Sequence, residues 1–192
     1  IPGNANSLAH NQVSAVLQDR QGNIWIGTMG GGLDLFDRSR HRFIHHRHQS
    51  RQPSSITSNR VSALYEDRKG TLWVGLWAGL GFNKFDPAGN AFTRYAIRYD
   101  SRKKDWYRDF LEDDQGNFWL GIWGDRGIRR FDRYTEKFGK EHFAHGPKPI
   151  DQQIISLSNQ ADTVMWMVTG KNHLVYYTRK GRSFHRINLG YQ

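Results

Sequence analysis

The chain has 192 residues, and its 28 Lys and Arg against 18 Asp and Glu give a formal net charge of +10. It contains no Cys, which excludes disulfides, thiolate catalysis and Cys-ligated metal sites. Its 7 Trp, 8 Tyr and 11 Phe are far more than a disordered polyelectrolyte carries, so the sequence predicts a folded chain whose core is built largely from aromatic rings.

A repeat signature follows the chain, with Trp25, Trp73, Trp119 and Trp166 about 47 residues apart. In the first three repeats the Trp is preceded by Asp-x-x-Gly-x-x and followed by x-Gly. The residues concerned are Asp19, Gly22 and Gly27; Asp67, Gly70 and Gly75; and Asp113, Gly116 and Gly121. In the fourth repeat Gln160, Thr163 and Val168 replace the Asp and the two Gly. The sequence therefore predicts four copies of one structural unit, the last of them degraded.

Each repeat is expected to form four short strands joined by tight turns, because apolar and polar residues alternate in short runs separated by Gly, Asp and Asn. In the second repeat these strands are expected at 61–66, 71–76, 81–86 and 91–95. The Asp-x-x-Gly segments fit four-residue turns, in which Asp bonds nearby backbone and Gly accepts a positive φ. This spacing predicts an all-β chain of β-propeller blades, each of four antiparallel strands. The expected blades cover residues 8–52, 53–98, 99–146 and 147–192.

The second repeat also resembles a known family. Its segment from Asn59 to Gly75 reads Asn-x-Val-x-x-Leu-x-Glu-Asp-x-x-Gly-x-Leu-Trp-Val-Gly, which is similar to the two-component regulator propeller repeat. Such repeats occur in the periplasmic sensor regions of hybrid histidine kinases. The resemblance is strong over residues 11–138 and weak over 150–188. It implies a periplasmic propeller that senses a ligand, with no catalytic activity and no cofactor in this segment, and with a kinase domain elsewhere in a longer protein.

Four repeats are fewer than the seven blades that the resemblance implies for a closed propeller. We therefore expect a fragment of a larger sensor, or a partial propeller that another copy completes. Any membrane contact is expected through segments of the full-length protein outside this sequence. An open array of blades leaves strand edges available for pairing, so self-association is expected.

The candidate ligand site lies on the face that carries the turn after the Trp strand and the long connection into the next blade. In an antiparallel blade this face is opposite the Asp-x-x-Gly turns. Trp77 and Trp123 occupy the same position in consecutive repeats, two residues after the Gly of the Trp strand. An exposed indole offers a flat surface to a sugar ring, and packing between blades is an equally open role for these two residues. The other candidate ligand-binding residues are Asn59, Trp106, Arg108, Asp125 and Arg126.

The basic residues have competing interpretations. Residues 102–104 and the stretch 38–51 would attract an anionic glycan, a nucleic acid or acidic lipid. A nucleic acid is disfavoured because no recognition helix, RNA-binding aromatic signature or zinc-finger spacing accompanies these residues. A metal site is disfavoured because His45 and His46 are expected on opposite faces of one strand.

The preferred interpretation is an extracytoplasmic, ligand-sensing propeller that binds an oligosaccharide, and the basic residues favour an anionic one. Two alternatives stay open. One is a protein-binding scaffold, and the other is a glycan-processing enzyme, because Asp-x-x-Gly-x-x-Trp is similar to the turns of sialidase-like propellers. The enzyme is disfavoured, since Asp105 and the loop at Asp125 are the only candidate carboxylates near the expected axis.

Overall fold

The computed structural model describes residues 6–77, 80–95, 106–124, 127–139, 153–160, 164–170, 173–178, 180 and 183–187. Within these ranges the chain consists of strands, turns and irregular connections. None of the described residues lies in a helix long and apolar enough to span a membrane. The chain divides into two compact units, Ile1–Tyr107 and Arg108–Gln192, and strand β9 crosses the boundary between them.

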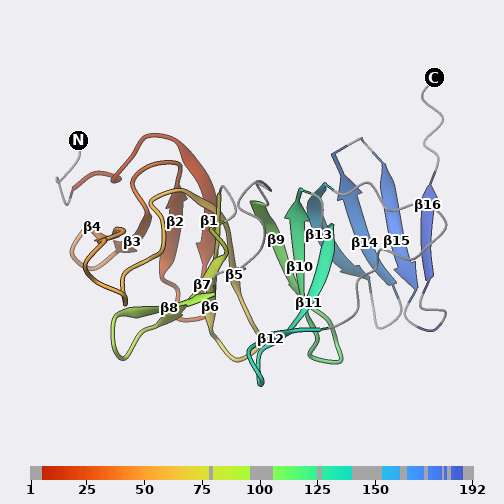
Figure 1. Cartoon of the computed structure of the whole chain (residues 1–192). Helices are drawn as coiled ribbons and strands as arrows, with labels where there is room; N and C mark the ends of the chain where they lie inside the picture. The colour runs from red at the N-terminus through yellow and green to blue at the C-terminus, as the bar shows by residue number, and fades with distance from the viewer. Residues whose placement is uncertain are drawn as a thin grey trace. The chain divides into compact units, whose positions relative to one another are not determined.

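The strands form four sheets, and each sheet contains four antiparallel strands in chain order (Figure 1). We call these sheets blades 1 to 4. Blade 1 contains β1 (Val13–Gln18), β2 (Ile24–Thr28), β3 (Leu33–Asp37) and β4 (Arg42–His46); blade 2 contains β5 (Val61–Glu66), β6 (Leu72–Leu76), β7 (Phe82–Asp86) and β8 (Ala91–Tyr95). Blade 3 contains β9 (Trp106–Glu112), β10 (Phe118–Trp123), β11 (Ile128–Asp132) and β12 (Lys137–Phe138); blade 4 contains β13 (Ile154–Gln160), β14 (Val164–Thr169), β15 (Leu174–Thr178) and β16 (Ser183–Ile187). The predicted all-β fold of four-stranded blades is therefore confirmed, while the exact blade boundaries stay a prediction.

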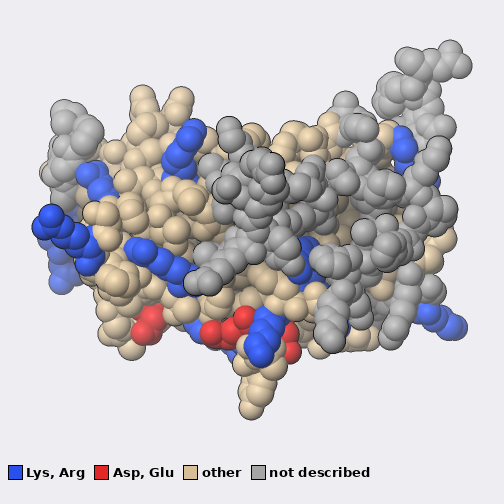
Figure 2. Space-filling view, viewed as in Figure 1, with Lys and Arg blue, Asp and Glu red and all other residues tan. Residues whose placement is uncertain are grey.

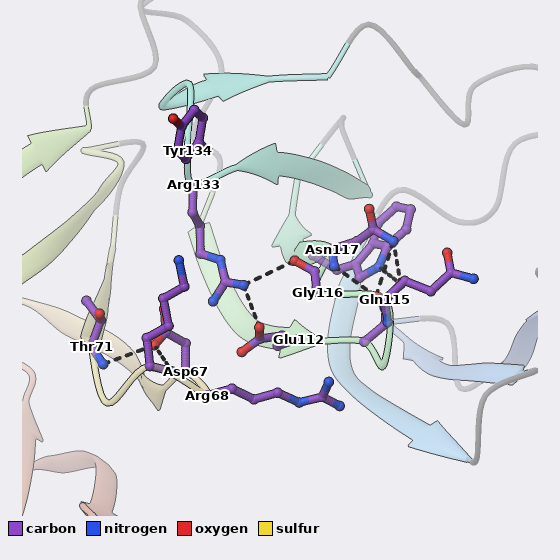
Figure 3. Close-up of polar contacts among 12 residues, drawn as sticks. Asp67, Arg68, Thr71, Glu112, Gln115, Gly116, Asn117, Arg133 and Tyr134 are labelled. Carbon is purple, nitrogen blue, oxygen red and sulfur yellow. Dashed lines mark hydrogen bonds and ion pairs between the residues drawn. The ribbon is translucent and has the colours of Figure 1, made fainter.

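The Asp of the signature organises the turn between the first two strands of its blade. In blade 2 the Asp67 carboxylate accepts the backbone N–H groups of Lys69 and Thr71 at 2.9 and 3.0 Å, and the bond from Thr71 is drawn in Figure 3. Gly70 has a φ of 79° and donates its N–H to the Asp67 carbonyl at 2.9 Å. This φ lies in the left-handed region, which Gly enters without the steric cost of a side chain. The turn therefore forms as the sequence predicts, with an Asp side chain that binds nearby backbone and a Gly that accepts a positive φ.

The same Asp also binds the indole of the signature Trp. Trp73 donates its Nε1–H to Asp67 at 2.9 Å, and the corresponding pairs are Trp25 with Asp19 at 2.8 Å and Trp119 with Asp113 at 2.9 Å. In blade 4, Gln160 accepts the indole N–H of Trp166 at 2.6 Å. The degraded repeat thus keeps the bond to Trp although its Asp is replaced.

In blade 1 these bonds lower the pKa of the signature Asp. Burial acts to raise the pKa of Asp19, but the hydrogen bonds from Trp25 and Asn23 outweigh burial, and the pKa is lowered. The Asp19 carboxylate therefore stays ionised at neutral pH while it accepts the hydrogen bonds of the turn and of the indole.

Blades 1 and 2 share a hydrophobic core within the unit Ile1–Tyr107. We call the side of a blade that packs on the following blade its trailing face, and the side that packs on the preceding blade its leading face. The trailing face of blade 1 supplies Trp25, Leu33, Leu17 and Leu35. The leading face of blade 2 supplies Val61, Leu64, Leu72, Val74, Phe85 and Phe92. His46 lies in the same contact, 5.3 and 5.6 Å from the rings of Phe85 and Phe92, and burial lowers its pKa.

Blades 3 and 4 repeat this arrangement within the unit Arg108–Gln192. Trp119 and Ile128 on the trailing face of blade 3 share a core with the leading face of blade 4, which supplies Ile154, Leu157, Met165, Met167, Val175 and Tyr177. The signature Gly explains how close the blades come. A Cβ on Gly27 would lie 2.5 Å from Val61, and one on Gly121 would lie 2.9 Å from Ile154. Only Gly lets the first strand of the next blade approach so closely.

The first strands of successive blades are also joined by bonds from a side chain to the main chain. The Ser14 hydroxyl donates to the Val61 carbonyl at 2.8 Å, and the Ser62 hydroxyl donates to the carbonyl of Tyr107. In the second unit the Asp109 carboxylate accepts the N–H of Leu157 at 2.7 Å. Each of these bonds runs from the side chain of one blade to the main chain of the next.

The strict alternation expected for residues 61–66 is broken at the start of β5. Val61 lies opposite Leu76 and Ala63 lies opposite Gly75, with a bulge between Val61 and Ala63. A bulge sets two residues of one strand against one residue of its partner, so the alternation shifts by one position. Val61 is therefore buried in the leading face of blade 2, and it does not share a face with Ala63 and Tyr65 as the simple alternation predicts. The same irregularity occurs in β1 and β13.

Candidate functional site

The described residues of the predicted ligand site belong to two different units. Trp77, Trp106 and Asn59 lie in Ile1–Tyr107, and Trp123 and Arg108 lie in Arg108–Gln192. The remaining candidates lie outside the described residues; these are Asp125 and Arg126, together with Asp105 and the basic run at 102–104.

Trp77 forms an aromatic pair with Trp106. Trp77 follows β6, and its backbone N–H donates to the Arg60 carbonyl at 3.1 Å. Its ring lies against Trp106, the first residue of β9, with ring centroids 4.4 Å apart and planes tilted by 50°. Both residues are half-buried, and both indole nitrogens are buried. The pair therefore presents ring carbon to solvent, which suits stacking more than hydrogen bonding through the indole N–H.

Trp123 packs on the blade that follows it. It is the last residue of β10, and it forms an isolated antiparallel bridge with Gln153, just before β13. Its ring occupies the space above Gly170, because a Cβ on Gly170 would lie 2.9 Å from Cη2 of Trp123. Trp123 is half-buried in this position. The contact corresponds to the inter-blade packing role that the sequence left open, and part of the side chain stays accessible.

Met29, Trp77, Trp123 and Gly170 hold equivalent positions at the end of the Trp strand of their blades: Trp123 is the last residue of its strand, and the other three follow theirs directly. The backbone N–H of Met29 donates to the Gln12 carbonyl at 3.0 Å, and that of Gly170 donates to the Gln153 carbonyl at 2.7 Å. The backbone geometry is thus retained while the side chain changes. The main-chain hydrogen bond at this position therefore does not depend on which side chain stands there.

Asn59 is used within the connection from blade 1 to blade 2. Its Oδ1 accepts the backbone N–H of His48 at 2.7 Å, and its carbonyl accepts the N–H of Gly32 at 2.9 Å. Arg94 of β8 holds the same connection by donating from Nε to the Ser55 carbonyl at 2.9 Å. This part of the candidate face is therefore ordered by internal hydrogen bonds, and the Asn59 amide contributes to that order.

Asp109 is a perturbed carboxyl that the sequence did not single out. Burial raises its pKa, although the hydrogen bonds from Leu157 and Ser156 and the charge of Arg108 act in the opposite direction. Asp109 stands where blades 1 and 2 have Ala15 and Ala63. A carboxylate at a position that is otherwise Ala is the sequence signal that would have revealed it. Its contacts assign it to the joint between blades 3 and 4.

Several basic residues are engaged on the side of the Asp-x-x-Gly turns. Arg133 donates to Glu112 at 2.5 Å and to the Gly116 carbonyl at 3.1 Å, as Figure 3 shows. In blade 1, Arg20 donates to the main-chain carbonyls of Arg68 and Asp67 at 2.7 and 3.1 Å. In the view of Figure 2, Lys and Arg occupy several separate places on the surface. Part of the positive charge therefore stabilises the fold.

The two neighbouring histidines of β4 point to opposite sides of the blade, as alternation predicts. Nδ1 of His45 lies 2.7 Å from Oδ1 of the buried Asp34, whereas His46 packs among aromatic rings. Among the residues that the structure describes, no group of three or more His, Asp or Glu is arranged to hold a metal ion.

Two segments of the chain match the family model of the two component regulator propeller, residues 7–30 and 55–78. Each segment runs from the end of the connection into a blade, through the first strand and the Asp turn, to just past the Trp strand of that blade. The blades concerned are blades 1 and 2. Over these two segments the chain is similar to that family. No curated protein matches the chain.

The fold of the chain is similar to that of several solved structures. The extracellular domain described as that of a hybrid two component system from B. thetaiotaomicron aligns with a TM-score of 0.77 and 22% identity, over 94% of this chain and 25% of that one. The extracellular domain of a one component system from the same organism aligns with a TM-score of 0.75 and 20% identity, over 92% of this chain and 25% of that one. A catalytically inactive virginiamycin B lyase from Staphylococcus aureus aligns with a TM-score of 0.71 and 12% identity, over 94% of this chain and 56% of that one. The chain thus spans about a quarter of the length of the first two structures. At these identities the likeness concerns the fold.

Proposed function

We propose that this chain is part of the extracytoplasmic, ligand-sensing propeller of a hybrid two-component signalling system, and that it acts in the periplasm. The observation that carries the proposal is the match of two blades to the regulator propeller repeat. The fold shared with extracellular domains of two-component systems supports it. In this proposal the segment works by binding, and a kinase domain elsewhere in the full-length protein performs the catalysis.

The proposed ligand is an anionic oligosaccharide that binds on the face carrying Trp77 and its equivalents. Trp77 and Trp106 form a partly exposed aromatic surface, and apolar ring faces are suited to stack on sugar rings. Arg108 and Arg126, together with the net charge of +10, favour carboxylate or sulfate groups on the ligand. Asp125 and Asn59 are the polar partners proposed for ligand hydroxyl groups, and Trp123 is the proposed second aromatic contact.

The test is a calorimetric titration with acidic and neutral oligosaccharides at low and high salt. We expect the acidic sugars to bind more tightly and to lose affinity as salt is raised, while part of the affinity remains because stacking is not screened. Trp77→Ala and Arg126→Ala should each weaken binding. Tyr134→Ala is the matched control, because Tyr134 is 94% exposed in the β11–β12 turn, at the opposite end of the strands.

Two results would overturn the ligand assignment. One is equal affinity for neutral and acidic sugars, and the other is unchanged binding in both site variants. In either case the sensor proposal has its own test, which is whether deletion of this region from the full-length protein abolishes ligand-dependent phosphotransfer.

A further inference from the structure

His46 occupies an aromatic position in blade 1 that Tyr95 occupies in blade 2. His46 ends β4 and Tyr95 ends β8, and each lies across from the first residue of the third strand of its blade. Each ring lies 5.8 Å from the signature Trp of its own blade, with the ring planes tilted by 34° for His46 and 37° for Tyr95. Blade 1 therefore places a ring that titrates near neutral pH where blade 2 has a phenol.

The ring of His46 lies inside the joint between blades 1 and 2. Trp25 packs against it from blade 1, and Phe85 and Phe92 pack against it from blade 2. His46 is 8% exposed, and its Nε2 is buried with no hydrogen-bond partner among the residues that the structure describes. A protonated ring in this place would bury a positive charge without an acceptor at Nε2.

Two neighbouring charges act on His46 in opposite directions. Burial lowers its pKa from 6.5, the charge of His45 acts with burial, and the charge of Asp34 acts against it. Asp34 is already an acceptor elsewhere, since its Oδ2 accepts the N–H of Ala9 at 2.7 Å and its Oδ1 lies 2.7 Å from Nδ1 of His45. The neutral ring is therefore the form that fits the closed joint.

The remaining charged groups on the elements around His46 do not compensate a charge on its ring. Arg47, the next residue along the chain, has the same sign of charge as a protonated imidazole. Lys84 and Asp86 flank Phe85 and so point to the other face of β7. The others have partners of their own: Asp19 binds the indole of Trp25, Arg94 donates to the Ser55 carbonyl, and Nδ1 of His48 lies 2.9 Å from the Ile56 carbonyl.

We propose that His46 makes the joint between blades 1 and 2 sensitive to acid, because the neutral ring closes the joint and the charged ring loosens it. The effect reaches the candidate ligand face through the main chain. His48, two residues after His46, donates its backbone N–H to Oδ1 of Asn59 at 2.7 Å. A looser joint therefore also loosens the connection from blade 1 to blade 2, which Asn59 orders. The inference does not depend on which ligand binds.

The first measurement is the titration of His46 itself, by NMR of the chain labelled with ¹³C at the imidazole Cε1. His46→Tyr, which introduces the residue of blade 2, identifies the His46 signal by removing it. We expect the midpoint of this signal to lie below 6.5. A midpoint at 6.5 or above would overturn the proposal, because it would show that the surrounding rings favour the charged imidazole.

The second measurement locates the effect by amide hydrogen exchange from about pH 7.5 to about pH 5. The results are expressed as protection factors, which remove the direct effect of pH on the exchange reaction. Because the pKa of His46 is lowered in the closed joint, its stabilising contribution is complete above pH 6.5 and is lost as the pH falls toward the lowered pKa. Relative to His46→Tyr, protection in β4 and β8 should therefore fall by up to about tenfold per pH unit below 6.5. Strands β14 and β15 of the other unit should show no such difference.

The control variant removes a histidine that is not buried. His41→Asn alters an exposed residue of the β3–β4 turn with a φ of 49°, a conformation that Asn accepts, and it should keep the acid response of the unaltered chain. His46→Leu replaces His46→Tyr if circular dichroism shows that the Tyr variant is unfolded. The proposal is wrong if β4 and β8 lose protection equally in the unaltered chain and in the His46 variant, or if His41→Asn abolishes the response.

Discussion

The signature Asp and Trp residues combine two structural roles in one short segment. Asp67 holds both the backbone of its turn and the indole of Trp73, six residues further along. The sequence predicts the first role, because Asp commonly binds the backbone two to four residues on. It does not predict the second, because that bond depends on the direction of a side chain on the neighbouring strand. Once the indole bond is known, the presence of Gln160 before Trp166 is understandable, since an amide oxygen accepts the same N–H.

Gly70 provides a direct test of the turn. Its φ is +79°, and a Cβ added there would find its nearest atom, Oε1 of Glu66, at 3.6 Å, so the site has room and the cost is purely conformational. We expect Gly70→Ala to lower the free energy of unfolding by about 1–2 kcal/mol, Gly70→Asn by less and Gly70→Val by more. Urea denaturation of the three variants checks this order. Equal stability of Gly70→Val and the unaltered chain would show that the turn is not formed as described.

Trp73 is the strongest test of the inter-strand packing. It is 2% exposed, and it lies 5.8 Å from the rings of both Phe82 and Tyr95. Trp73→Ala should reduce the free energy of unfolding by about 3–5 kcal/mol, the usual cost of removing a large buried aromatic residue. Tyr134→Ala, at an exposed position, should change it by less than about 0.5 kcal/mol. A loss below about 1 kcal/mol for Trp73→Ala would contradict the buried position.

Strands and blades were predictable from the sequence to different extents. The strands expected at 61–66 and 91–95 coincide with β5 and β8, and those expected at 71–76 and 81–86 begin one residue earlier than β6 and β7. Short alternating runs between Gly and Asp contain that information. The bulge at Val61 was not predictable from alternation, because it lies where the first strand of blade 2 meets the preceding blade at Gly27.

The candidate site was less predictable, because its side chains are placed by contacts between blades. The sequence identified Trp77 and Trp123 as equivalent positions on the loop side of the blade. It had no means of showing that Trp77 packs on Trp106 or that Trp123 covers Gly170, since both contacts join residues of different repeats. For the same reason Asp109 was missed, because its role depends on the main chain of β13.

The joint between blades 3 and 4 should respond to pH through Asp109. Burial raises its pKa above the ordinary value of 3.8, so the folded state binds this proton more tightly than the unfolded state does. The group therefore favours folding at pH values below 3.8, and this contribution is lost as the pH rises toward the raised pKa. Asp109→Asn removes the titration and keeps an oxygen for the N–H of Leu157.

We expect the stability of Asp109→Asn, relative to the unaltered chain, to increase as the pH is raised from about 4 to about 7. Urea denaturation of both chains at several pH values measures this difference in the free energy of unfolding. The other titrating groups contribute equally to both chains and cancel in the difference. A difference that is constant or decreases with pH would show that the carboxyl is not destabilised by burial.

The charge of the whole chain sets the salt response of the proposed ligand binding. With a net charge of +10, the chain attracts an anionic sugar. Raising the ionic strength from about 0.05 to about 0.5 M screens this attraction. Binding of acidic oligosaccharides should therefore weaken, while binding of neutral ones should change little, and calorimetry measures both. An equal salt dependence for acidic and neutral sugars would contradict an electrostatic contribution from the basic residues.

The bonds between first strands have a consequence for how repeats are joined. Ser14 binds the carbonyl of Val61, and Ser62 binds the carbonyl of Tyr107, so in both cases the acceptor is a main-chain atom. Every residue type carries such a carbonyl, and the join therefore requires no matching side chain in the neighbouring repeat. A blade that carries this Ser can therefore be joined to a following blade of any sequence, and a repeat placed after it needs no compensating substitution at the acceptor position.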